Sequence, residues 1–561
     1  MEERRHPQRD RQASGDGEAS FRLPLNYLPR RYDLRLAPRP AAGSFVGGAS
    51  VTVEVATPLP APTRSLTMHA LELAIEPADV SVRPPPHRRA EAAEETPEAD
   101  TARLQCVAVR SSPAAETITL DFAACLPNVA GDTFVVDIAR FTGHIYDSVA
   151  SCGLFYSNSH DTNFLSTHLE PTNARLLFPC FDEPAYRAVF QLTVEFDSRY
   201  TVVAGTRAVR EELVAVDEDV FGARFCDPPP SPARDASKSA SFTGGGYSVR
   251  GDSLGAAPAN ARDGDELGAT ERMAGSGASA SLSTAPPLRG VRGRAASAAA
   301  AEDDVPTAAG PQEGRSCPHW RRRNCDPLED AASDSPTCLV RRVFFADTPL
   351  LCTCAVGFNI GRFYIREETT PDRLLCRVII PAEVQVNYGW YALDLLTKAV
   401  AFFDDYFAFR LPLQKLDLVC LRCCGFLAME NWGMISMHLD YMLVNESTPL
   451  ERRQRIARLI GHMVARQWVG NSAAIAWWSS LWIREGVCGY LSFTFVDSVY
   501  PNWLMWEAFL TQVLDDALVL DSQPEKTHPL QCCNATQGTW RTTSTPSALA
   551  KGRRSFVCSP S

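Results

Sequence analysis

Apolar and polar side chains alternate through much of the first half of the chain. Residues 51–55 read Val-Thr-Val-Glu-Val, which is the period-two pattern of a strand with one buried face. The runs 118–122 and 134–138 have the same character, and a further strand pattern covers 338–345. We therefore predict β structure from Phe21 to about Thr206, with another strand far along the chain.

Three polar segments interrupt this pattern. Residues 1–20 are charged and predict a disordered tail, and residues 83–103 form a polar insert rich in Pro, Ala and Glu. Between 227 and 316 only ten of 90 side chains are large and hydrophobic. So few cannot offset the entropy cost of ordering, which predicts a disordered insert over about 215–338. Because a strand pattern follows it, we expect this insert to interrupt one β domain that covers 21–365.

After about residue 366 the pattern turns helical and aromatic. Residues 448–451 read Thr-Pro-Leu-Glu, the form of a capping box with Pro at the first helical position. Apolar residues then recur at helical spacing, which predicts a helix over 449–468 and a second helix over about 479–499. We assign 366–531 to a second domain and 532–561 to an irregular tail.

Composition narrows the possible functions. Hydrophobic residues make up 45% of the chain and charged residues 22%, as in ordinary soluble proteins. With 55 Lys and Arg against 66 Asp and Glu, the net charge of −11 predicts neither a nucleic-acid nor a membrane partner. No signal peptide or apolar run of transmembrane length is visible, so we expect a cytoplasmic protein whose 18 cysteines are mainly free thiols.

One group of residues indicates a damaged metal site. A zinc peptidase places two His at i and i+4 on a helix, with a Glu beside the first as the base and a carboxylate from the next helix as the third ligand. Here His462 and Glu485 stand at this spacing, whereas Met463 occupies the base position and Arg466 the second His position. A single His on a helix is more often structural, so the surrounding motifs decide the interpretation.

Those motifs resemble the M1 family of zinc aminopeptidases, the gluzincins that include aminopeptidase N and puromycin-sensitive aminopeptidase. The chain carries Ala-Met-Glu-Asn at 428–431, Gln-Trp-Val-Gly-Asn at 467–471 and Trp-Trp at 477–478 ahead of Glu485-Gly486. The N-terminal half agrees through Glu-Pro-Thr-Asn-Ala-Arg at 170–175. The resemblance covers about 21–530, apart from the inserts.

The resemblance implies an α+β fold. The region 21–365 would be an N-terminal β-saddle domain, and 366–531 a thermolysin-like α/β domain that carries the zinc helices. Family members usually continue into a small β-sandwich and a large helical domain. The sequence stops before both, so we expect the C-terminal helical domain to be absent.

The departures from the family pattern argue against catalysis. Arg466 keeps its proton and cannot be a ligand, which leaves His462 and Glu485 as remnant ligands. Met463 cannot accept a proton, and 543–549 lacks the Tyr that the family uses to stabilise its intermediate. We therefore predict that no catalytic residue is intact and that zinc, expected for the family, is not bound.

A salt bridge offers a physical replacement for the metal. A buried Glu485 without a counter-charge would be costly or protonated. We therefore expect Arg466 to pair with Glu485 where the zinc would lie. Cys488, one turn further on, is expected to be a buried free thiol rather than a rescuing ligand.

The residues that recognise substrate are better kept. In the family, the Glu of the Met-Glu-Asn motif and an acidic residue of the Glu-Pro-Thr stretch bind the free α-amino group of a peptide. These positions are Glu430 and Glu170, and the further candidates for substrate binding are Ala428, Met429, Asn431 and His168. The alternative is that both carboxylates are retained by descent alone.

Three functions therefore stay open. The first is a non-catalytic pseudoenzyme that binds peptide N-termini or a protein partner. The second is an active zinc aminopeptidase that releases N-terminal amino acids from peptides. The third is a zinc-free structural scaffold in a protein complex. Whether the chain is an enzyme is uncertain from the sequence, although Met463 and Arg466 argue against activity.

Overall fold

The computed structural model describes residues 22–83, 103–158, 161, 163–216, 320–322, 338–384 and 386–524. The predicted tails, 1–20 and 532–561, and most of the two predicted inserts lie outside these ranges. The domain limits proposed from the sequence stay predictions. No helix among the described residues has the length and apolar character needed to cross a membrane.

The N-terminal half forms a 15-stranded sheet with its core on the alternating residues predicted from the sequence. Part of this sheet runs in the order β7-β2-β1-β10-β14-β12, with β12 at the end of the order, and β1 pairs in parallel with β10. In β2 every second side chain is buried, including Val51, Val53 and Val55, which confirms the strand prediction there. The strand bounds are β1 Tyr27–Arg39, β2 Ser44–Val55, β3 Ser65–His69, β4 Val80–Arg83, β5 Leu104–Ser112, β6 Thr117–Phe122, β7 Thr133–Tyr146, β8 Gly153–Tyr156, β9 Leu165–His168, β10 Arg187–Asp197, β11 Thr201–Ala204, β12 Ala208–Val216, β14 Cys338–Phe345, β15 Leu351–Cys352 and β16 Phe358–Gly361.

The long segment between β12 and β14 joins neighbouring strands. Ala208–Val216 pairs antiparallel with Cys338–Phe345 along nearly the whole length of both strands. The chain therefore leaves this sheet and returns to the adjacent position in it, even though more than 100 residues intervene.

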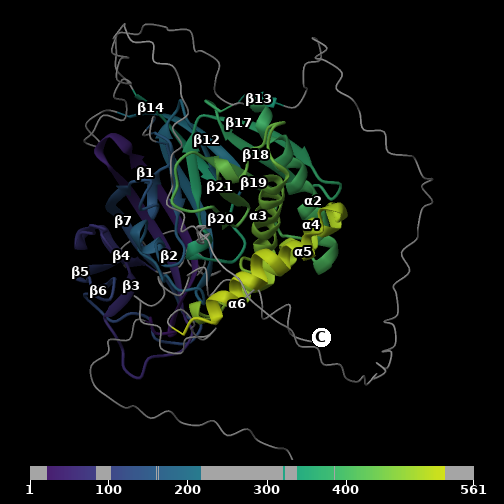
Figure 1. Cartoon of the computed structure of the whole chain (residues 1–561). Helices are drawn as coiled ribbons and strands as arrows, with labels where there is room; N and C mark the ends of the chain where they lie inside the picture. The colour runs from purple at the N-terminus through teal and green to yellow at the C-terminus, as the bar shows by residue number, and fades with distance from the viewer. Residues whose placement is uncertain are drawn as a thin grey trace, which may run out of the picture. The chain divides into compact units, whose positions relative to one another are not determined.

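The second half combines a six-stranded sheet with helices, so the α+β prediction is confirmed. The sheet order is β13-β17-β18-β19-β21-β20, which leaves β20 at one edge. Helices α2 and α3 pack on this sheet against β18 and β20 (Figure 1). The bounds are β13 Trp320–Arg322, β17 Phe363–Thr369, β18 Leu375–Pro381, β19 Lys415–Leu421, β20 Ala428–Asn431, β21 Met434–His438, α2 Trp390–Phe407, α3 Leu450–Trp468, α4 Leu481–Val499, α5 Met505–Phe509 and α6 Asp515–Asp521, with a π-helical turn at Leu510–Leu514.

The start of α3 differs from the prediction. The helix begins at Leu450 with Pro449 as its N-cap, and no side chain caps it. Thr448 instead bonds Asn445, accepting from its backbone N–H and donating to its Oδ1, each at 2.9 Å. The predicted capping box is therefore wrong, because Thr448 lies one position too early. The two predicted helix spans are confirmed by α3 and α4.

A close helix contact brings the two zinc-motif segments together. Gly461 of α3 faces Phe495 of α4, where a Cβ would lie only 2.6 Å from Phe495 Cδ1. Because only a residue without a side chain fits here, the two helices approach closely along this face. This contact places the residues after Gly461 opposite the first turns of α4.

Candidate functional site

Four elements supply a buried group of charged side chains. Helix α3 carries His462 and Arg466 at i and i+4, so both lie on one face. The first turns of α4 carry Arg484 and Glu485, β20 carries Glu430, and the loop after β9 carries Glu170. We call these six residues the arginine–glutamate cluster. None of its side chains is more than 16% exposed.

One nitrogen of Arg466 contacts all three carboxylates. Its Nη2 lies 2.5 Å from Glu430 Oε1, 3.2 Å from Glu170 Oε2 and 3.2 Å from Glu485 Oε1. The predicted salt bridge between Arg466 and Glu485 is thus confirmed. Arg466 pairs with more carboxylates than predicted, because Glu170 and Glu430 contact the same guanidinium group.

Arg484 is a second cation, which no sequence motif indicated. Its Nη2 donates to Glu170 Oε1, its Nε donates to Glu485 Oε1 at 3.3 Å, and its Nη1 lies 3.7 Å from Glu430 Oε1. The stem of Arg484 runs through the space that a side chain at position 470 would need, since a Cβ on Gly470 would lie 2.9 Å from Arg484 Cδ. Gly470 therefore lets this arginine turn back into the cluster.

His462 completes the cluster from the side of α3. Its Nε2 lies 3.3 Å from Glu485 Oε2, so Glu485 is contacted on one oxygen by His462 and on the other by the two arginines. His462 and Glu485, which the sequence predicts as remnant ligands, are thus bonded to one another. Three carboxylates face two guanidinium groups, which leaves one negative charge for His462 or a bound proton to balance.

The pKa values of the three carboxyl groups diverge. Burial opposes ionisation of Glu485, but Arg466, the hydrogen bond to His462 and Arg484 outweigh it and hold its pKa well below the ordinary value. Burial also opposes ionisation of Glu170, but the positive charges of Arg484 and Arg466 outweigh it and lower the pKa of this carboxyl group. For Glu430 burial prevails over Arg466, and its pKa is raised to about 7.

The residues present do not fit a catalytic zinc ion. Such a site needs three protein ligands around an open position. The position of the second His is taken by Arg466, whose Nη2 is already bonded to Glu485, and a guanidinium group cannot ligate. Among the described residues, no three His, Cys, Asp or Glu side chains form a group that could hold a metal ion.

The residues beside these positions supply neither a base nor a ligand. Met463 is buried in the apolar core that α3 shares with the second sheet. Cys488 is a buried free thiol whose Sγ lies 3.5 Å from the Val469 carbonyl oxygen, and burial raises its pKa above the ordinary value. The expectation that Cys488 stays a buried thiol is confirmed.

The predicted substrate residues are only partly brought together. Glu170 and Glu430 meet around Arg466, and Glu430 Oε2 has no hydrogen-bond partner among the described residues. Asn431 instead donates to the Val356 carbonyl oxygen at 2.9 Å. His168 Nδ1 lies 2.7 Å from the Ser151 carbonyl oxygen, and burial lowers the pKa of this histidine. On β20, Met429 is buried and Ala428 is half-buried.

Two polar residues of the Gln-Trp-Val-Gly-Asn motif hold β20 against α3. Gln467 Oε1 accepts from the Gly433 backbone N–H at 3.0 Å. Asn471 Nδ2 donates to the Glu430 carbonyl oxygen at 2.8 Å. The motif therefore fixes the backbone that carries Glu430, a positioning role that its sequence alone did not indicate.

Comparisons with known proteins agree with this geometry. The Peptidase M1 N-terminal domain model matches residues 28–233, and the Peptidase family M1 domain model matches 391–552. Aminopeptidase M1-C of Oryza sativa is 27% identical over 516 residues, which is 91% of this chain and 41% of that protein. Aminopeptidase M1 of Arabidopsis thaliana is 24% identical over 513 residues, or 91% of this chain and 42% of that protein.

A fungal relative matches a shorter stretch. Aminopeptidase 2, mitochondrial, of Saccharomyces cerevisiae is 34% identical over 189 residues, which is 33% of this chain and 19% of that protein. The match to the two plant relatives covers most of this chain, but it covers only about two fifths of the length of those proteins. The paired β and peptidase domains, together with the motifs around the arginine–glutamate cluster, show that the chain belongs to peptidase family M1.

Proposed function

We propose that this chain is a non-catalytic M1 aminopeptidase homologue in which two arginines replace the charge of the metal. The observation that carries the proposal is the contact of Arg466 Nη2 with the carboxylates of Glu170, Glu430 and Glu485, each at 3.2 Å or less. The role of such a protein rests on its fold and on what it binds.

The alternative of an active peptidase lacks the groups it needs. A positioned acid or base contributes about 10²–10⁴ in rate, and Met463 has no proton-accepting atom. A zinc ion in this place would also have to displace Arg466 from Glu485, at the cost of leaving a buried guanidinium group unpaired.

Zinc content and turnover, measured in the same purified sample, test this proposal. We expect substoichiometric zinc and no release of amino acids from a panel of fluorogenic aminoacyl amides. About one zinc per chain with chelator-sensitive turnover would overturn the proposal, since this is the loading of a working single-zinc site.

Binding of peptide N-termini is the second candidate. It is favoured by Glu430 Oε2, a buried carboxylate oxygen without a hydrogen-bond partner among the described residues, which a peptide ammonium group could bond. Against it, the other oxygen of Glu430 already pairs with Arg466, so an incoming amine would compete with an internal cation.

Calorimetry with alanyl-phenylalanine amide and its N-acetylated counterpart separates this candidate from a pure scaffold. Binding of the free amine alone, lost in Glu430→Gln but kept in the exposed control Glu451→Gln, would support recognition of N-termini. Equal binding of both peptides, or of neither, would leave the scaffold role.

A cytoplasmic location belongs to the same proposal. The eleven cysteines whose side chains the structure describes are all free thiols, as suits a reducing compartment. Fluorescence microscopy of the tagged chain in its own cells tests this location, and residence in an oxidising compartment would contradict it.

A further inference from the structure

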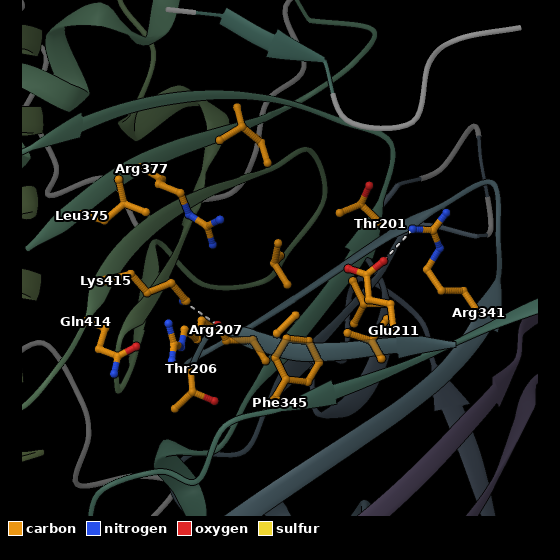
Figure 2. A pocket seen from close by; sticks show the side chains of 16 residues that line it. Thr201, Thr206, Arg207, Glu211, Arg341, Phe345, Leu375, Arg377, Gln414 and Lys415 are labelled. Atoms are coloured by element: carbon orange, nitrogen blue, oxygen red, sulfur yellow. Dashed lines mark hydrogen bonds and ion pairs between the residues drawn. The ribbon is translucent and has the colours of Figure 1, made fainter. Parts of the chain in front are cut away.

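A cavity lies where the two sheets meet, and it is separate from the arginine–glutamate cluster. Its volume is about 830 Å³, within the range of small-molecule sites. Strands β11, β12 and β14 of the first sheet form one wall, and β17, β18 and the start of β19 form the other (Figure 2). None of its lining residues belongs to the arginine–glutamate cluster.

The lining carries more positive than negative charge. Among the described residues, four cations border the cavity, Arg207, Arg341, Arg377 and Lys415, and Glu211 is the only lining carboxylate. Glu211 forms a salt bridge with Arg341, in which Glu211 Oε2 lies 2.8 Å from Arg341 Nη1. Three cations therefore remain to be balanced by groups behind the wall.

In the described part of the chain, a single carboxylate pairs directly with Arg377 and Lys415, two of these three cations. Asp417 is fully buried behind the wall, and its two oxygens accept from Arg377 Nε and Nη2 and from Lys415 Nζ, all at 2.7 Å. Glu367 acts on Arg377 at longer range and does not line the cavity. Arg207 is exposed and forms no side-chain ion pair among the described residues, so its charge is available to a ligand.

Arg377 is held in place for anion binding. Its pair with Asp417 fixes the guanidinium plane through Nε and Nη2, while Nη1 forms no bond to the described residues. Figure 2 shows the guanidinium group turned into the cavity. An arginine pre-oriented by a buried carboxylate loses less freedom when it bonds an anion.

Lys415 contributes charge rather than a free donor. Its Nζ donates to the Ala204 carbonyl oxygen at 2.6 Å and to the Gly433 carbonyl oxygen at 3.1 Å, in addition to Asp417. All three of its N–H groups are thus used. Of the three remaining cations, Arg207 and Arg377 are therefore the two that keep N–H groups for a ligand.

Apolar side chains also line the cavity, alongside the polar Thr201, Thr206 and Gln414. Val202, Val343 and Phe345 cover the side of the first sheet, and Ile365 and Leu375 cover the side of the second. A ligand that matches both features has an anionic head and an apolar body. An inorganic ion alone would leave the apolar wall unused.

We propose that this cavity binds a small organic anion, a phosphate ester or a carboxylate. The head group lies between Arg207 and Arg377, and the apolar body packs on Phe345 and Leu375. This site is independent of the proposed loss of catalysis, so either conclusion can fail without the other.

Isothermal titration calorimetry of the full chain tests the site with phenyl phosphate, benzoate and inorganic phosphate. The variant is Arg207→Glu, an exposed position whose change leaves the buried Arg377–Asp417 pair intact. The control is Arg64→Glu, which makes the same change of charge at an exposed position outside the cavity lining. Phenyl phosphate and benzoate distinguish the two kinds of head group.

We expect an organic anion to bind at least about tenfold more tightly than inorganic phosphate, since tenfold corresponds to only 1.4 kcal/mol of apolar contact. Arg207→Glu should weaken that binding by about tenfold or more, and Arg64→Glu should leave it unchanged. Failure of both organic anions to bind, or equal weakening by the two variants, would overturn the proposal.

Discussion

Removal of Arg466 tests whether the arginine–glutamate cluster is held by its charges. In Arg466→Met a flexible apolar chain replaces the buried guanidinium group, and Glu170, Glu430 and Glu485 keep Arg484 as their only arginine. Removing one partner from a buried ion pair costs about 3–5 kcal/mol, because an uncompensated charge stays behind. At roughly 2–4 °C per kcal/mol, the value for an unfolding unit of about 150–250 residues such as the second half of the chain, the unfolding midpoint of that half should fall by roughly 6–20 °C.

Two further variants make this result specific. Arg452→Met removes an arginine from the same helix at a half-exposed position, where its Nη2 lies 3.4 Å from Asp440, and should cost less than about 1 kcal/mol. Adding Glu430→Gln to Arg466→Met removes one of the unbalanced carboxylates. The double variant should therefore recover at least about 1 kcal/mol relative to additivity.

Differential scanning calorimetry at neutral pH measures all five proteins, which are wild type, Arg466→Met, Arg452→Met, Glu430→Gln and the double variant, with urea unfolding as a second readout. If Arg466→Met cost no more than Arg452→Met, the contacts of Arg466 would not be stabilising the fold. The view that its charge replaces that of a metal would then be refuted.

The same structure predicts three other outcomes. The pKa of Glu430 is raised to about 7 in the folded state, so the stability that its bound proton contributes is complete below the ordinary pKa and is lost as the pH rises through 7. The free energy of unfolding of the wild type should therefore fall by about 2 kcal/mol between pH 5.5 and 8. In Glu430→Gln this part of the pH dependence should disappear, because the amide does not titrate. Gly461→Ala should destabilise the chain by about 1–3 kcal/mol in urea unfolding, since its Cβ would lie 2.6 Å from Phe495 Cδ1, and an unchanged midpoint would argue against the close packing of α3 on α4. Dialysis against a chelator should leave the calorimetric midpoint unchanged, because arginines rather than a metal balance the cluster, and a fall of several degrees would contradict this.

Strands and helices that have one buried and one exposed face could be predicted from the sequence. In β2 the alternating valines mark the buried face, and in α3 the apolar residues recur at helical spacing. β19 was not predicted in this way, because polar and apolar residues alternate only over 415–418 and a Val-Cys-Leu run follows. All of its side chains are buried, so its polar positions do not mark an exposed face. The predicted capping box failed because a Thr-Pro-x-Glu pattern does not show which residue the helix starts from.

The part of the candidate site whose geometry follows from a motif could be predicted from the sequence. The path of Arg484 could not, because it depends on the backbone around Gly470. The i and i+4 spacing of His462 and Arg466, with Glu485 on the next helix, was enough to predict the Arg466–Glu485 pair. Arg484 stands beside Glu485 in the sequence, and nothing in that adjacency says that its side chain turns inward. Its path depends on the space beside Gly470, which only the folded chain reveals.

The two guanidinium groups of Arg466 and Arg484 carry the same total charge as a zinc ion, so both must be removed before a metal can take their place. Arg466 and Arg484 together balance two of the three carboxylates and supply N–H donors to each of them. Restoring the family residues on α3 with Met463→Glu and Arg466→His therefore should not restore metal binding, because Arg484 still bonds Glu485 and Glu170. Adding Arg484→Ala to that pair should allow about one zinc per chain, measured by atomic absorption after dialysis. Stoichiometric zinc in the double variant alone would show that Arg484 is not part of the replacement.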